Sequence, residues 1–193
     1  MADLVGVPEE ELWPEVRKRD EPAASALPAG IKKVYPHRWE VPQSVWRQFF
    51  ESAEREIGVL VYSGLFLADD TGILRIFERK AREGVKVRLL LGNPDSPHVE
   101  ERGREEGIGE AMSAKIRNAL VLYRPLLKIG GIELRLHGTV LYNSIYRADT
   151  ETFINPHAYG TPASSTPIFH LEGDSNIGRV YQTAFETIWN TSY

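Results

Sequence analysis

The chain has 193 residues, of which 42% are hydrophobic, and its formal net charge is −4. This length and hydrophobic content fit one ordinary domain with a buried core and argue against global disorder. The acidic balance argues against binding duplex DNA by charge alone, because such binding needs a surplus of Lys and Arg on one face. The chain has no cysteine, which excludes disulfides and thiolate chemistry and fits a reducing compartment. No apolar run is long enough to cross a bilayer, and residues 1–14 carry acids rather than the basic and apolar stretches of a signal peptide, so we expect a cytoplasmic location.

The first 40 residues divide into two parts by composition. Residues 1–16 place apolar side chains around an acidic PEEE run, which favours a helix start because proline and carboxylates suit the first turn. Residues 17–40 are charged and then rich in Ala, Pro and Ser, which is typical of a linker. The main domain is therefore predicted over residues 41–193.

The first half of this domain shows alternating helical and strand patterns. Apolar spacing predicts helix, strand, helix and strand over residues 42–57, 59–63, 72–84 and 85–91. This order implies a right-handed parallel unit. Residues 98–128 are predicted to be mostly helical, interrupted by glycines and ended or kinked at Pro125.

The second half is predicted to be mostly strands with one closing helix. The strand patterns cover residues 132–137, 140–146, 152–159 and 168–171, and the helical pattern covers residues 177–189. Together the elements predict an α/β fold with a mixed β-sheet flanked by helices.

Polar side chains are concentrated between Leu136 and Leu171, in and between the predicted strands. They are His137, Asn143, Arg147, Asp149, Asn155, His157 and His170. Buried polar side chains need partners, so each histidine taken singly is interpreted as a satisfied structural residue. Three histidines near an arginine in one sheet region favour an anionic ligand, often a phosphate, which a guanidinium can grip with two bonds.

The order of these elements, with VLVYSGLFLAD, GVKVRLLLG and IELRLH in sequence, resembles one half of the phospholipase D-like superfamily. In that superfamily a strand ends in H-x-K-x-x-x-x-D, and a short Gly/Ser/Asn element follows. The resemblance implies that His137 is the nucleophile and that a histidine is the acid, either His137 of the partner subunit or a local His157 or His170. Asn143 and Asp149 are candidates to orient the nucleophile. It also implies a homodimer, because two copies of the motif form one site.

Two residues depart from the superfamily motif. Thr139 stands in place of the lysine, and Ser144 stands in place of the aspartate. Without the lysine, a transferring phosphoryl group loses a positive clamp worth several kcal/mol in comparable sites. Arg147 is able to replace this clamp from the same hairpin.

The run LHGTVLYNSIYRAD with NPHAYG, preceded by RGREEGIGEAMSAKIRN, resembles more closely the phospholipase D-like C-terminal domain of Xre-type helix-turn-helix regulators in actinobacteria. Residues 1–16 resemble the last helices of such a DNA-binding region. They do not resemble the helix that reads DNA bases, because their glutamates would repel phosphates and they contain no cluster of Arg or Asn to contact base edges. A simple N-terminal helix packing on the domain is the alternative interpretation of these residues.

Further polar residues complete the candidate site. Lys115 and Arg102 are candidates for a second basic wall, although a solvated, salt-bridged helix face is the simpler interpretation. Ser63 follows a strand end, where α/β folds commonly bind ligands. With Arg147, Asn155, Thr139 and Ser144, these residues form the predicted ligand-binding set. A metal is disfavoured because no tight H-x-H or H-x-x-x-H spacing occurs, and no cofactor is expected.

These observations leave two hypotheses of different classes, and a plain dimerisation module as a third. The favoured hypothesis is a dimeric, ligand-sensing domain of a transcriptional regulator that binds a small phosphate-bearing anion or nucleotide near His137. The alternative is a phosphodiesterase or nuclease that uses His137 as nucleophile in a homodimeric site. Contact with DNA is expected only through a helix-turn-helix region that this chain does not hold complete, and no membrane partner is expected.

Overall fold

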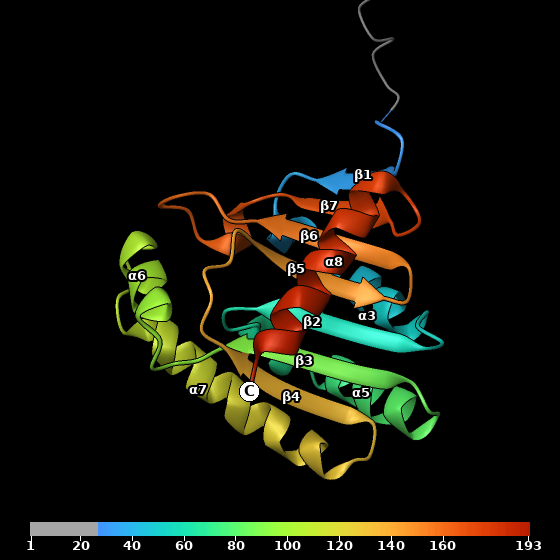
Figure 1. Ribbon diagram of the computed structural model, residues 1–193, viewed down its shortest axis with the longest axis horizontal. Coiled ribbons are helices and arrows are strands. Elements are labelled where there is room, and N and C mark those ends of the chain that lie inside the picture. The colour runs from blue at the N-terminus through green and yellow to red at the C-terminus, as the bar shows by residue number, and fades with distance from the viewer. Residues whose placement is uncertain (1–26) are drawn as a thin grey trace, which may run out of the picture.

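The computed structural model describes residues 27–193, which form one seven-stranded sheet with helices on both faces (Figure 1). The strand order is β1-β7-β6-β5-β2-β3-β4. Strands β2, β3 and β4 are mutually parallel, and every other neighbouring pair is antiparallel. The predicted class, α/β with a mixed sheet flanked by helices, is confirmed.

The elements have the following bounds. The strands are β1 (Ile31–Tyr35), β2 (Glu56–Val61), β3 (Lys86–Gly92), β4 (Ile132–His137), β5 (Asn143–Ala148), β6 (Glu151–Pro156) and β7 (Ile168–Glu172). The α-helices are α3 (Gln43–Glu51), α4 (Leu65–Ala68), α5 (Thr71–Arg82), α6 (Pro97–Glu105), α7 (Ala111–Tyr123) and α8 (Asn176–Thr191). The 3-10 helices are η1 (Arg38–Glu40), η2 (Arg124–Lys128) and η3 (Ala163–Ser165).

The interior strand β2 is buried on both faces and lies between the parallel strand β3 and the antiparallel strand β5. Its side chains alternate between two hydrophobic clusters, with Val59 in one and Leu60 in the other. Helices α3 and α5 cover the first face, and α8 crosses the second (Figure 1). Helix α7 contributes to both clusters, with Tyr123 in the first and Ile116 in the second.

Capping side chains and glycines determine where several helices begin and end, and some of these ends differ from the predicted boundaries. Asp70 caps α5 by accepting hydrogen bonds from the amides of Gly72 and Ile73. The helix predicted over residues 42–57 ends at Glu51, and β2 begins at Glu56. The helical stretch predicted over residues 98–128 divides into α6, α7 and η2, because Gly107 and Gly109 adopt positive φ between α6 and α7.

Strand β1 was not predicted. It lies within residues 17–40, which composition assigned to a linker, but residues 31–35 are an edge strand paired antiparallel with β7. Lys32 and Lys33 stand in its middle, which conceals the strand pattern and is typical of a protected sheet edge. The helical tail predicted over residues 1–16 lies outside the described residues. Among residues 27–193, no helix is both long and apolar enough to span a membrane.

Candidate functional site

A pocket of about 300 Å³ lies where the carboxyl end of β2 meets the start of β5 and the segment after β6. Ser63 and Gly64 follow β2, Ser144 belongs to β5 and His157 follows β6. The carboxyl end of a parallel strand beside a change in strand direction is where open α/β sheets commonly bind ligands. The fold therefore places this pocket at an expected ligand position.

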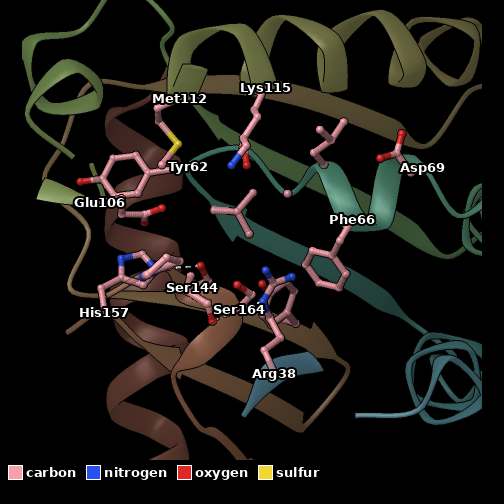
Figure 2. Close-up of a pocket in the computed structure, with 17 residues that line it drawn as sticks. Arg38, Tyr62, Phe66, Asp69, Glu106, Met112, Lys115, Ser144, His157 and Ser164 are labelled. Carbon is pink, nitrogen blue, oxygen red and sulfur yellow. Dashed lines mark hydrogen bonds between the residues drawn. The ribbon is translucent and has the colours of Figure 1, made fainter. Parts of the chain in front are cut away.

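Two cationic side chains reach into the pocket from opposite sides, Arg38 from η1 and Lys115 from α7 (Figure 2). Within residues 27–193 neither makes a salt bridge. The Arg38 guanidinium lies 4.0 Å from the ring centroid of Phe66, a cation–π contact that fixes its position. The pocket thus presents positive charge that is held in place without a carboxylate partner.

Two carboxylates also line the pocket. Glu106 is turned to Arg102, and the oxygen–nitrogen distance of this buried pair is 2.7 Å. Asp69 is exposed and lies at the far end of the pocket from His157 (Figure 2). Arg102 also pairs with Glu105, so it is shared by two carboxylates and compensates the charge of Glu106 in part, whereas Arg38 and Lys115 have no carboxylate partner within residues 27–193.

Ser144 and His157 form the clearest hydrogen-bonded pair in the pocket. The Ser144 Oγ lies 3.0 Å from His157 Nε2 (Figure 2). On the other side of the ring, His157 Nδ1 lies 3.1 Å from the Leu141 carbonyl oxygen. A carbonyl only accepts, so Nδ1 carries the proton and Nε2 accepts from the Ser144 hydroxyl. Burial, with the positive charges of Arg102 and Arg38, lowers the pKa of His157 to about 4.

This lowered pKa predicts a loss of stability in mild acid. Between pH 6.5 and about 4 the unfolded chain takes up a proton at residue 157 and the folded chain does not. The free energy of unfolding should therefore fall with pH in this window, by about 2 kcal/mol from His157 after allowance for its partial exposure. Urea titrations at pH 7 and pH 4.5 should show a smaller drop for His157→Gln than for wild type. An equal drop in His157→Gln, with His98→Gln as control, would contradict the assignment.

His137, predicted to be the nucleophile, is turned into the core. Its side chain is 2% exposed, and its Nε2 lies 3.0 Å from the Val61 carbonyl, to which it donates. Burial lowers the pKa of His137, so the imidazole is neutral. His137 does not line the pocket, and Tyr62 packs beside it with ring centroids 5.9 Å apart. Because His137 does not line the pocket and its Nε2 is bonded to the Val61 carbonyl, it is not placed to attack a ligand there.

Both arginines of the predicted ligand set have partners within the protein. Arg147 projects from β5 onto the α8 face, where its Nη1 lies 2.6 Å from Glu186. Arg102 is buried on α6, where it pairs with Glu106 and donates to the Thr161 carbonyl at 2.9 Å. Arg147 is outside the pocket, and Arg102 lines only a neighbouring cavity of about 200 Å³ that shares His157 and Tyr62 with it.

Asp149, predicted to be catalytic, holds a turn together. It lies between β5 and β6 with a φ of 52°, a conformation that Asp tolerates better than most residues. Its carboxylate accepts from the amides of Glu54, Arg55 and Glu56, at 2.7, 2.9 and 2.8 Å. These bonds lower the pKa of Asp149, although burial alone would raise it.

Replacing Asp149 by alanine is expected to destabilise the fold without changing the pocket. The change leaves these amides without their acceptor and keeps the positive φ, and we expect a loss of about 2 kcal/mol of unfolding free energy. Chemical denaturation of Asp149→Ala and of the exposed control Asp174→Ala measures this directly. Unchanged stability in Asp149→Ala would show that the three hydrogen bonds do not support the turn.

The remaining predicted residues occupy structural positions around the sheet. Asn155 is fully buried beside Ser144 in the strand register, and its amide donates to Thr166 Oγ1 at 2.7 Å. His170 lies on β7, with its Nε2 2.5 Å from Glu151. Neither lines the pocket, and the same is true of Asn143 and Thr139.

The structure therefore brings together part of the predicted site. The pocket contains the predicted residues Ser63, Lys115, Ser144 and His157. Sequence reasoning missed Arg38, because it lies in the segment interpreted as a linker. No group of three or more His, Cys, Asp or Glu side chains in residues 27–193 is arranged to hold a metal ion.

Comparisons with known proteins bear on the fold. No family model matches the chain, and no curated protein matches it by sequence. TrmBL2, an archaeal chromatin protein whose structure shows a novel mode of DNA binding, is similar in structure with a TM-score of 0.50 and 16% identity. The match covers 95% of this chain but only 58% of TrmBL2. Nuc, a phospholipase D family member from Salmonella typhimurium, matches with a TM-score of 0.45 and 16% identity, over 78% of this chain and 88% of Nuc.

Proposed function

We propose that this chain is a phospholipase D-like domain that binds a small phosphate-bearing anion in the pocket between Arg38 and Lys115. The observation that carries this proposal is the pair of cations, which face one pocket and make no salt bridge within residues 27–193. Arginine and lysine donate charge-assisted hydrogen bonds to phosphate oxygens, which are stronger than neutral ones. The Ser63 hydroxyl supplies a further donor on the β2 side of the pocket.

In this proposal the ligand regulates the activity of a transcription factor of which the domain is a part. Support comes from the sequence resemblance to domains attached to Xre-type regulators, and from the departures Thr139 and Ser144. The buried His137 supports the same interpretation, since the alternative phosphodiesterase would need this imidazole at the ligand. A homodimer and a cytoplasmic location belong to the proposal through the resemblance.

Calorimetric titration with inorganic phosphate tests the anion site. We expect binding to wild type, and a loss of affinity of about tenfold or more in Arg38→Gln and in Lys115→Met, since a hydrogen bond to a charged group is worth about 1.5–3 kcal/mol. Lys128→Met is the matched control, because Lys128 is an exposed lysine on η2 outside the pocket. Absence of phosphate binding to the folded wild-type chain, or equal weakening in the control, would reject the proposal.

A further inference from the structure

The Ser144–His157 pair has the arrangement of an activated nucleophile. The hydroxyl of Ser144 is within hydrogen-bond distance of an imidazole nitrogen, and a third group, the Leu141 carbonyl, orients the ring. This spatial arrangement, in which a base contacts the nucleophile and a third group orients the base, is typical of an activated serine. Three serines line the pocket, Ser63, Ser144 and Ser164. Of these three, only Ser144 makes a side-chain hydrogen bond to a histidine of the part of the chain that the structure describes.

The surroundings hold the pair in the competent protonation state. The His157 ring stacks on Tyr62, with ring centroids 5.7 Å apart and planes at 25°. The Tyr62 hydroxyl accepts from the Leu141 amide at 3.0 Å, so the same short segment fixes both rings. The imidazole is neutral with its Nε2 lone pair directed to Ser144, and no rearrangement is needed before a proton is accepted.

The position of Ser144 also suits a phosphoryl group. Ser144 is 4% exposed on the pocket wall, and Arg38 and Lys115 reach into the same pocket. Preorganised cations stabilise the charge that develops on phosphoryl oxygens during displacement. The pocket therefore combines a nucleophile, a base and two cations, whereas the buried His137 supplies none of these functions to a ligand.

We propose that Ser144 and His157 act as nucleophile and general base in the hydrolysis of a small phosphate ester bound in this pocket. The inference rests on the anion site proposed above and adds a reaction to it. Its nucleophile is the residue that stands in place of the aspartate of the superfamily motif.

The reaction balances in two steps. In the first, Ser144 Oγ bonds to phosphorus, the bond from phosphorus to the ester oxygen breaks, and the hydroxyl proton moves to His157 Nε2 and then to the departing alkoxide. In the second, a water oxygen bonds to phosphorus and its proton moves to His157 Nε2. The bond from phosphorus to Oγ then breaks, and the proton returns to Oγ. The products are an alcohol and phosphate, and the serine is regenerated.

Covalent labelling with diisopropyl fluorophosphate tests the nucleophile. Fluoride is the leaving group, and mass spectrometry of digested protein locates the diisopropylphosphoryl group. We expect labelling of Ser144 in wild type and in the matched control Ser164→Ala, and no pocket labelling in Ser144→Ala. His157→Gln should label about 100-fold more slowly, since a general base contributes about 10²–10⁴ in rate. Location of the group in wild type keeps the test valid even where a variant fails to fold.

Protection by inorganic phosphate separates this inference from the proposed anion site. Slower labelling of wild-type Ser144 in phosphate, together with hydrolysis of p-nitrophenyl phosphate that Ser144→Ala loses, supports both. If calorimetry shows phosphate binding but Ser144 is not labelled, or Ser164 is labelled equally, the assignment of Ser144 as nucleophile is wrong and the anion site stands. If Ser144 is labelled and the ester is hydrolysed, but phosphate neither protects Ser144 nor binds by calorimetry, the roles of Ser144 and His157 are supported and the anion site is rejected.

Discussion

Replacing Gly58 by valine is expected to lower the free energy of unfolding by about 3 kcal/mol. Gly58 lies in the middle of the interior strand β2, where α8 rests on the sheet. A Cβ at this position would meet the Phe185 ring at 3.0 Å and the Arg147 Cβ at 3.4 Å. Phe185 is fully buried, so its ring cannot move into solvent and α8 must lift.

A graded series makes this prediction specific to the helix–sheet contact. Gly58→Ala should cost about 1 kcal/mol and Gly58→Val about 3, as measured by urea denaturation. Gly130→Ala is the control, since an added Cβ there meets no atom within 4 Å. The double variant Gly58→Val with Phe185→Leu should lose less unfolding free energy than the sum of the losses in the two single variants, because the smaller leucine side chain relieves the clash. Full additivity would place the origin of the instability elsewhere.

Local patterns were sufficient for most of the fold because they depend on neighbours in sequence. The buried runs that became β2 and β3 are strongly apolar, and the parallel unit follows from their order with α5. Strand β1 exists only because it pairs with β7, from the far end of the chain. No local pattern encodes such a partner, and Arg38, which directly follows this strand, was missed for the same reason.

The same limit applies to the candidate site: strand periodicity predicts which residues share a face, but it does not predict contacts between distant segments. Ser144 and Arg147 are three residues apart on one strand, and the two-residue period of a strand places them on opposite faces. That separation could have been predicted, and it removes Arg147 from the pocket. The bond from Ser144 to His157 could not, since it depends on the chain after β6 returning to β5, where the His157 amide donates to the Tyr142 carbonyl at 2.8 Å.

Removing the carboxylate of Glu186 is expected to destabilise the second face of the sheet by about 3 kcal/mol. Glu186 on α8 accepts from Arg88 at 2.6 and 2.8 Å and from Arg147 at 2.6 Å. Without it, both largely buried guanidinium groups share Glu56 alone. The value is the lower end of the range of about 3–5 kcal/mol for breaking a buried pair, because Glu186 is 42% exposed and partly screened.

The pH dependence of this network gives a second measurement. The hydrogen bond from Arg88 is the main cause that lowers the pKa of Glu186 from 4.5 to about 2. A depressed carboxyl pKa stabilises the fold above pH 4.5, and this contribution is lost as pH falls toward 2. Glu186→Ala should therefore lose less stability than wild type over this window in urea titrations. An equal acid-induced loss in both proteins would show that the network does not set this carboxyl pKa.

Arg147 separates the structural interpretation of this network from the ligand-binding role that the sequence suggested. Arg147→Met should lower the free energy of unfolding, and a double-mutant cycle with Glu186→Ala should show coupling because the two side chains share hydrogen bonds. The affinity for inorganic phosphate should stay within about twofold of wild type, because Arg147 and the pocket lie on opposite faces of β5. A twofold change corresponds to well below about 1 kcal/mol of binding free energy. Weakened phosphate binding in a folded Arg147→Met protein would instead place the anion near α8. Binding that depends on Arg38 and Lys115 but not on Arg147 would locate the anion on the pocket face.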